Sequence, residues 1–416
     1  MILRGWLTAL LLCCAAAVCA QQADAPIIRE ITFEGNTTTR AKVMLREMVV
    51  GVGDKADPQR IEASRQAVLD LGLFHSVGVR EEPVEGGVRL VFTVKEKWFI
   101  LPLPRVGYDS DRHLSIGGQL TWYDLFGLNQ TLRANWVRSG GDTAGRGPTQ
   151  RASASYDIPF LDDSPWALNV SGGRSRGPVT TPTEYEEINE NAGFIFTRAL
   201  SGHPFSQGWR AGGGLQWQHE DTNGINAPSP LGHATALAGV ASFRNLHYHV
   251  FSEEGTVFSV NTAFAVQDVA SDYSYEQISS DWGRYMEIGT TPYQSLNVFA
   301  SGGIRMQGPG RGSAFAIGGR STLRGYPSGV FEGNFYYRVA GEYLHPLHWD
   351  WLRGLVVLEA GNAFLDPYHP NLRRVHTSLG LGLRARVTWL VNFEVEAGVA
   401  VPLDQRPEPR FFGGRN

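Results

Sequence analysis

Arg324 and two downstream glutamates are the side chains whose types and spacing could build a buried charged site. Arg324 follows a pair of glycines and precedes another, which would let the backbone turn tightly. Each glutamate lies in a segment where polar and apolar residues alternate. A guanidinium held away from water needs carboxylate partners, and its planar fork suits two of them. The alternative is a solvated arginine on a surface loop. The candidate residues are Gly318, Gly319, Arg324, Gly325, Tyr326, Glu342 and Glu359.

No other group of residues predicts catalysis or cofactor binding. The sequence lacks a nucleophile with a neighbouring base, a phosphate-binding loop and a dinucleotide fingerprint. The pairs His247/His249 and His345/His348 have metal-like spacing only by chance. A net charge of −4 gives no basic stripe for nucleic acid. We therefore expect no enzyme, no metal, no cofactor and no nucleic-acid partner.

The first twenty residues have the pattern of a secretory signal peptide. One arginine precedes an apolar run, and a small residue, Ala20, stands at the expected cleavage point. All three cysteines (Cys13, Cys14 and Cys19) lie in this segment, so residues 21–416 contain no thiol. Lipid attachment at Cys19 is the alternative, but Val18 stands where such signals carry a small residue. The sequence predicts export, with signal peptide 1–20.

Residues 26–97 predict a small α+β domain of the order β-α-α-β-β. A strand over 27–33 ends at Gly35 and Asn36, which allow a turn. The hydroxyls of Thr37 to Thr39 are expected to cap a first helix, and Asp57-Pro58 to start a second. Gly72 closes that helix, and two further strands follow, separated by a turn at 85–87.

Residues 98–416 predict a transmembrane β-barrel of about sixteen antiparallel strands. Apolar and polar residues alternate along segments such as 377–387 and 391–399, and one face carries nearly all the charge. A soluble sandwich would alternate in the same way. Export, long strands and arginine-rich polar faces favour apolar-out, polar-in packing. Because lipid leaves unpaired strand edges unsatisfied, such a sheet must close. All lysines lie before residue 98, which marks the boundary.

The N-terminal domain resembles a POTRA domain, the polypeptide-transport-associated module of BamA-like proteins. The matching pattern is Ile-x-Phe-x-Gly-Asn, two helices, then Gly-x-Phe-x-x-Val-x-Val. These residues are also core and turn positions of any small α+β domain. The resemblance implies an exposed sheet edge that could pair with a client strand. The residues are Ile31, Phe33, Gly35, Asn36, Gly72, Phe74, Val77 and Val79.

The last third resembles the barrel of the same superfamily. Residues 315–326 are similar to its long sixth extracellular loop, which has an Arg-Gly-Tyr/Phe tip. The resemblance implies that the loop folds into the lumen, where Arg324 pairs with Glu342 and Glu359. The family usually carries aspartate at the second acidic position. Glu359 is therefore one methylene longer, which would shift the resting place of the loop.

The resemblance covers nearly all of residues 26–416 and implies an outer-membrane assembly or translocation protein. Expected partners are outer-membrane lipids, unfolded β-barrel clients at the domain edge or barrel seam, and periplasmic accessory proteins. The seam would lie between strands near 104–109 and 411–414, where a short last strand weakens closure. Two readings stay open beside assembly. One is a two-partner-secretion-like transporter, which typically has two POTRA domains, and the other is a passive channel. A single domain leads us to expect an accessory role.

Overall fold

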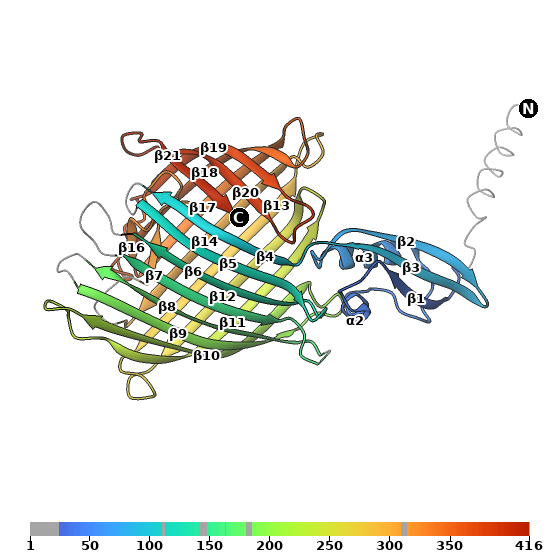
Figure 1. Ribbon diagram of the computed structural model, residues 1–416, viewed down its shortest axis with the longest axis horizontal. Coiled ribbons are helices and arrows are strands. Elements are labelled where there is room, and N and C mark those ends of the chain that lie inside the picture. The colour runs from blue at the N-terminus through green and yellow to red at the C-terminus, as the bar shows by residue number, and fades with distance from the viewer. Residues whose placement is uncertain are drawn as a thin grey trace, which may run out of the picture.

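The computed structural model describes residues 25–109, 113–140, 148–162, 164–179, 185–308 and 314–415. The predicted signal peptide lies outside these residues. The chain forms a small α+β domain followed by a large sheet that curls into a barrel, with the domain beyond one end of it (Figure 1). Neither helix among the described residues is long and apolar enough to cross a membrane.

The N-terminal domain has the predicted β-α-α-β-β order. Its elements are β1 (Ile28–Glu34), α2 (Ala41–Leu45), α3 (Pro58–Leu69), β2 (Phe74–Val84) and β3 (Gly87–Glu96). The sheet order is β1-β3-β2, with β1 parallel and β2 antiparallel to the central β3. Both outer strands therefore have a free edge within the domain. Asp57 caps α3 through its side chain, as the Asp-Pro pair predicts.

The predicted threonine cap of the first helix is wrong. The helix has only five residues, its N-cap is Arg40, and no side chain bonds the cap. The threonine hydroxyls are engaged by distant acids instead. Thr37 Oγ1 donates to Glu96 Oε2 at 2.6 Å, and Thr39 Oγ1 donates to Asp124 Oδ2 at 2.8 Å. These long-range acceptors outcompete a local cap that sequence spacing alone suggested.

The sixteen predicted barrel strands are confirmed as one antiparallel sheet in the order β21 to β17, then β14 to β4. Figure 1 shows the strands inclined to the barrel axis. The strands are β4 (Ile100–Asp109), β5 (His113–Leu125), β6 (Gln130–Ser139), β7 (Thr149–Ile158), β8 (Trp166–Val179), β9 (Tyr185–Ala199), β10 (Gly208–Asn223), β11 (Gly232–Tyr248), β12 (Glu253–Ala265), β13 (Tyr275–Glu287), β14 (Ser295–Met306), β17 (Phe335–Pro346), β18 (Leu352–Phe364), β19 (His376–Arg386), β20 (Glu394–Pro402) and β21 (Arg410–Arg415).

The alternation of side chains has the phase that the sequence predicts. On β19 the outward residues Leu379, Leu381 and Leu383 are exposed, whereas Ser378 and Arg384 are buried inside. Many other large apolar side chains are exposed on the outer wall, among them Trp136, Phe194, Leu237 and Leu358. An apolar exterior with a charged interior is the arrangement of a membrane barrel rather than of a soluble sandwich.

The second helix of the N-terminal domain docks on the barrel rim. The Asp70 carboxylate, at the C-cap of α3, accepts from the Tyr248 N–H at 2.8 Å and lies 2.7 Å from Nδ1 of His247. The Gln66 amide donates to the Tyr248 carbonyl at 3.1 Å. His247 is thus used in a contact between the domain and the barrel.

The segment after α2 contacts a second part of the rim, the β9–β10 turn. Glu47 is fully buried, and its Oε2 accepts from Ser206 N at 3.1 Å and Oγ at 2.7 Å. The Arg46 carbonyl lies 2.7 Å from Nδ1 of His203, and its guanidinium lies over the ring of Phe160. Burial raises the pKa of Glu47, while the Ser206 hydrogen bonds oppose the shift.

One hydrophobic core runs through the domain and into the barrel end. It joins domain residues such as Phe74 and Leu90 to Phe99, Tyr123 and Val391 of the barrel. Close to this core, burial lowers the pKa of Lys97 to about 8. Because the contacts reach the β5–β6, β7–β8, β9–β10 and β19–β20 turns and the end of β11, the domain is packed across the rim.

Candidate functional site

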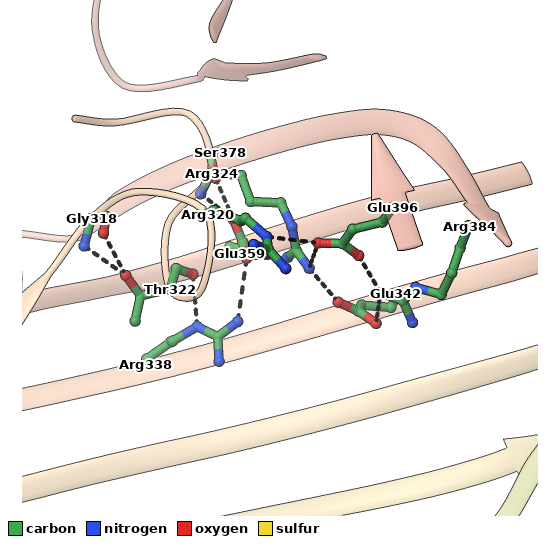
Figure 2. A network of polar contacts seen from close by, with 10 residues as sticks. All are labelled: Gly318, Arg320, Thr322, Arg324, Arg338, Glu342, Glu359, Ser378, Arg384 and Glu396. Atoms are coloured by element: carbon green, nitrogen blue, oxygen red, sulfur yellow. Dashed lines mark hydrogen bonds and ion pairs between the residues drawn. The ribbon is translucent and has the colours of Figure 1, made fainter. Parts of the chain in front are cut away.

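The segment between β14 and β17 packs against the inner face of the barrel wall. It contains a small hairpin, β15 (Phe315–Ile317) with β16 (Phe331–Gly333), and between them a compact turn that carries Arg324. Leu323 and Tyr326 beside Arg324 are buried. The turn contacts the inward residues of β17 to β20, so it occupies the side of the sheet that carries the charge (Figure 2).

Arg324 meets both predicted glutamates. Its Nη1 donates to Glu359 Oε1 at 2.6 Å, and its Nη2 donates to Glu342 Oε1 at 2.7 Å. Its backbone N–H also donates to Glu359 Oε2 at 2.6 Å. The exposed fraction is 5% for Arg324, 4% for Glu342 and 1% for Glu359. The carboxylates therefore face a guanidinium in a largely water-free environment, where charge pairing is strong.

Further residues complete this network and were not predicted as part of it. Glu396 of β20 lies 3.4 Å from Arg324, and Arg384 of β19 donates to Glu342 and Glu396 at 2.8 Å each. Arg338 of β17 donates to the Thr322 carbonyl at 2.7 Å and lies 3.3 Å from Glu359. We call Arg324, Arg338, Arg384, Glu342, Glu359 and Glu396 the Arg324 cluster (Figure 2).

Glu359 is the central acceptor of the cluster. Besides two donors of Arg324, its carboxylate accepts from Ser378 Oγ at 3.0 Å and from Arg338 at 3.3 Å. The longer glutamate side chain thus reaches donors on the loop and on both neighbouring strands. The sequence signal that could have found Glu396 and Arg384 was their inward phase, but phase alone does not say which inward residues face each other.

The neighbours of Arg324 fix the turn against the wall. The Tyr326 hydroxyl donates to the Thr377 carbonyl at 3.0 Å and also bonds Asp404. A Cβ at Gly325 would lie 2.7 Å from Ser378 Cβ and 2.8 Å from the Val401 carbonyl carbon. Glycine is therefore required by close approach of the loop to β19 and β20.

Gly318 and Gly319 shape the start of the turn. Both have positive φ, +122° and +83°. The Gly319 N–H donates to the carbonyls of Leu323 and Tyr326 at 3.0 Å each. The two glycines thus close the turn that presents Arg324 to the wall.

The predicted motif residues of the N-terminal domain lie in its core and turns. Phe74 is buried, and Phe33 packs beside the core. Gly35 and Gly72 have positive φ, and the Asn36 amide donates to the Thr39 carbonyl at 3.0 Å. These positions belong to the domain that lies beyond one end of the barrel (Figure 1), and they shape that domain.

Comparison with known proteins places both parts of the chain. Residues 26–97 match the POTRA family, described as "Surface antigen variable number repeat". The outer membrane protein assembly factor BamA of Neorickettsia risticii (strain Illinois) is 37% identical over 106 residues, which are 25% of this chain and 14% of that protein. The chain thus matches only about a seventh of the length of this relative.

The whole fold is similar to solved structures of two barrel proteins. BamA from Haemophilus ducreyi lacking POTRA domains 1-3 has a TM-score of 0.56 at 16% identity, over 94% of this chain and 85% of that one. CdiB from Acinetobacter baumannii has a TM-score of 0.60 at 14% identity, over 94% and 73%. CdiB from Escherichia coli has a TM-score of 0.62 at 14% identity, over 93% and 75%. The POTRA match and the BamA relative thus support a POTRA domain over residues 26–97, and the chain as a whole shares the fold of the BamA and CdiB barrels.

Proposed function

We propose that this protein assists unfolded β-barrel polypeptides to insert into the outer membrane, with its POTRA domain in the periplasm. The observation that carries the proposal is the buried Arg324 cluster, which holds a loop against the inner wall by three carboxylates. A loop held so firmly fills space that a secreted chain would need. Client polypeptides would then be assisted at the sheet edges, and this requires no enzymatic step.

The docked POTRA domain supports the same proposal. Its contacts reach four of the turns at one end of the barrel and the end of β11, and its core is continuous with barrel residues. Passage of a polypeptide through the lumen would have to displace both this domain and the loop. Strand addition at an edge requires neither, since an edge strand is a ready template. The name of the BamA relative, an assembly factor, points the same way.

The test is insertion of a urea-unfolded model barrel into liposomes that contain the purified protein. Wild type is expected to accelerate insertion over empty liposomes, and Arg324→Ala to lose most of that effect while it remains heat-modifiable. Arg373→Ala, at an exposed loop position, is the matched control. If insertion equals that of empty liposomes and only ion conductance appears, the passive-channel reading replaces the proposal.

A further inference from the structure

We propose that the lumen cavity beside the loop that carries Arg324 binds a small oxyanion of the phosphate type between Arg353 and Arg384. The inference goes beyond the proposed function, because it assigns a ligand to the lumen and not a path to a client. The cavity has a volume of about 320 Å³ and lies between the loop residues Arg320 and Ser321 and the inward residues of β12 to β14 and β17 to β20. A polar cavity of this size accommodates a small anion together with water.

The wall of this cavity carries more cations than anions. The described residues that line it include six arginines and three glutamates, Glu253, Glu342 and Glu394. Ion pairs add Glu359 and Glu396, so that five carboxylates serve six guanidinium groups. Because a charge held away from water is unfavourable unless it is paired, this excess favours an anion in the cavity. The arginines are Arg320, Arg324, Arg338, Arg353, Arg384 and Arg386.

Two of these arginines lie side by side. Arg353 of β18 and Arg384 of β19 form a direct cross-strand pair, and both side chains line the cavity. Their exposed fractions are only 2% and 4%. Like charges directly opposite each other on antiparallel strands destabilise a sheet. An oxyanion between the two guanidinium groups would offset their repulsion by its attraction to both.

The same pair has donors that the protein does not use. Arg384 donates only from Nη2, to two carboxylates at 2.8 Å each, so its Nη1 has no partner among the described residues. Arg353 Nη1 lies 3.5 Å from Ser295 Oγ, which is at the limit of a hydrogen bond. The Nε of each arginine is buried and has no partner in the described part of the chain. An oxyanion offers several acceptors at once, which is the chemistry that these N–H groups need.

The ligand that fits is a free oxyanion and not the headgroup of a lipid. The site lies on the inner, charged side of the wall, whereas the apolar side chains that suit lipid are on the outer side. Guanidinium groups bind phosphate through paired N–H donors, and a halide ion has no pair of oxygens to match them. The geometry therefore favours phosphate over chloride.

A second cavity, of about 220 Å³, lies where the POTRA domain meets the barrel rim. It shares Glu253, Arg386 and Glu394 with the lumen cavity, so this ion-paired group lies between the two. Lys97 also lines the second cavity. An anion that approaches from the side of the POTRA domain would therefore meet a further cation before it reaches the lumen site.

Equilibrium dialysis of the full chain against radiolabelled inorganic phosphate tests the site. The protein is kept in dodecyl maltoside, which carries no phosphate, and chloride holds the ionic strength constant at neutral pH. We expect saturable binding of one phosphate per chain, and an unfolding temperature that rises with phosphate but not with chloride of equal ionic strength. Absence of saturable binding would overturn the inference.

Arg353→Met removes one charge of the pair and keeps most of the side-chain length. Phosphate binding is expected to weaken roughly tenfold or more. Without phosphate, the unfolding temperature should equal or exceed that of wild type, because the repulsion is gone while Glu394 keeps its 2.6 Å bond from Arg386. Arg373→Met, at an exposed loop position, is the matched control and should bind phosphate as wild type does. Unchanged phosphate binding by Arg353→Met would overturn the inference, whatever its stability.

A measurement on wild type removes any dependence on how the variant folds. Crystals are grown with selenate, a tetrahedral oxyanion that contains an anomalous scatterer. We expect an anomalous peak between the guanidinium groups of Arg353 and Arg384. Peaks only at other places on the protein, or none, would contradict the proposed site. No arm of the test involves a client, so its failure and the failure of the proposed function are separate results.

Discussion

At the scale of single residues, the Arg324 cluster is costly to build and costly to break. Removing charged groups from water is unfavourable, and the cluster offsets that cost by mutual pairing and by hydrogen bonds to Ser378 and Thr322. Loss of one partner leaves the others buried without compensation. The cluster therefore stabilises the seated loop as long as its partners are all present.

Arg324→Ala is expected to release the loop and to destabilise the barrel by about 3–5 kcal/mol, because Glu342, Glu359 and Glu396 lose their shared cation. Arg324→Lys should be intermediate, since an ammonium lacks the planar fork. Limited trypsin digestion at Arg320, with heat-modifiability as a check of folding, measures both effects. Equal protection of Arg320 in wild type and Arg324→Ala would contradict the account.

Gly325→Ala tests the close approach of the loop to the wall. Its Cβ would overlap the backbone of Val401 and Pro402, so we expect a loss of about 1–3 kcal/mol in the free energy of unfolding. Gly341→Ala is the matched control, because a Cβ there has nothing within 4 Å. Denaturant titration in detergent compares the two, and equal midpoints would speak against the seated loop.

Arg324, Glu342 and Glu359 could be predicted together from the sequence. Arg324 stands in a recognisable loop motif, and the alternation of polar and apolar residues places both glutamates on the inward face of the strands that follow. Glu396 and Arg384 were on the correct face but not assigned to the site. Which inward side chains meet depends on strand register and on where the loop rests, and neither is encoded in local spacing.

At the scale of elements, the strands and the Asp57 cap of α3 were predictable, whereas the cap of the first helix was not. Period-two alternation and turn residues mark each barrel strand independently of the others. The predicted cap of the first helix was wrong because Thr37 and Thr39 bond acids that lie 59 and 85 residues away in the sequence. Local spacing cannot reveal such partners. The packing of the POTRA domain on the rim could not be predicted from the sequence either, since its contacts join residues that are far apart in the chain.

The buried Glu47 makes domain docking sensitive to pH. Its pKa in the docked state is raised above the ordinary 4.5, so the docked form holds the proton more tightly than the undocked form. Docking is then strongest near or below pH 4.5 and weakens as the pH rises through the raised pKa. We expect the unfolding temperature of the domain to fall from pH 5 to pH 7.5.

Glu47→Gln, which is neutral at every pH, should flatten that dependence, and Glu85→Gln at an exposed turn should leave it unchanged. The titration of Lys97, whose pKa is lowered to about 8, adds little below pH 7.5 because the side chain is mostly protonated there. An identical slope in wild type and Glu47→Gln would show that docking does not depend on this carboxylate.

At the scale of the whole molecule, the barrel has a POTRA domain packed on one rim and a loop held on its inner wall, and over the described residues β4 and β21 each have an edge without a strand partner. The fold class and strand number came from the sequence. How the domain, the loop and the strand edges lie relative to one another could not be predicted from the sequence. Their arrangement depends on how the sheet curls to bring its first and last strands, about 300 residues apart, toward each other. The central claim is that clients use the edges and that the loop can stay seated.

The most direct measurement joins the loop covalently to the wall and then follows client insertion. Thr322→Cys and Arg338→Cys stand where the Arg338 side chain now contacts the Thr322 carbonyl, and residues 21–416 contain no other cysteine. A short bis-maleimide links them. The same protein without the linker is the control, and it has lost the contacts of Arg338 with Thr322 and Glu359 to the same extent. The account predicts equal insertion rates for the linked and unlinked proteins. Loss of insertion on linking would contradict it and would show that the client path runs through the lumen.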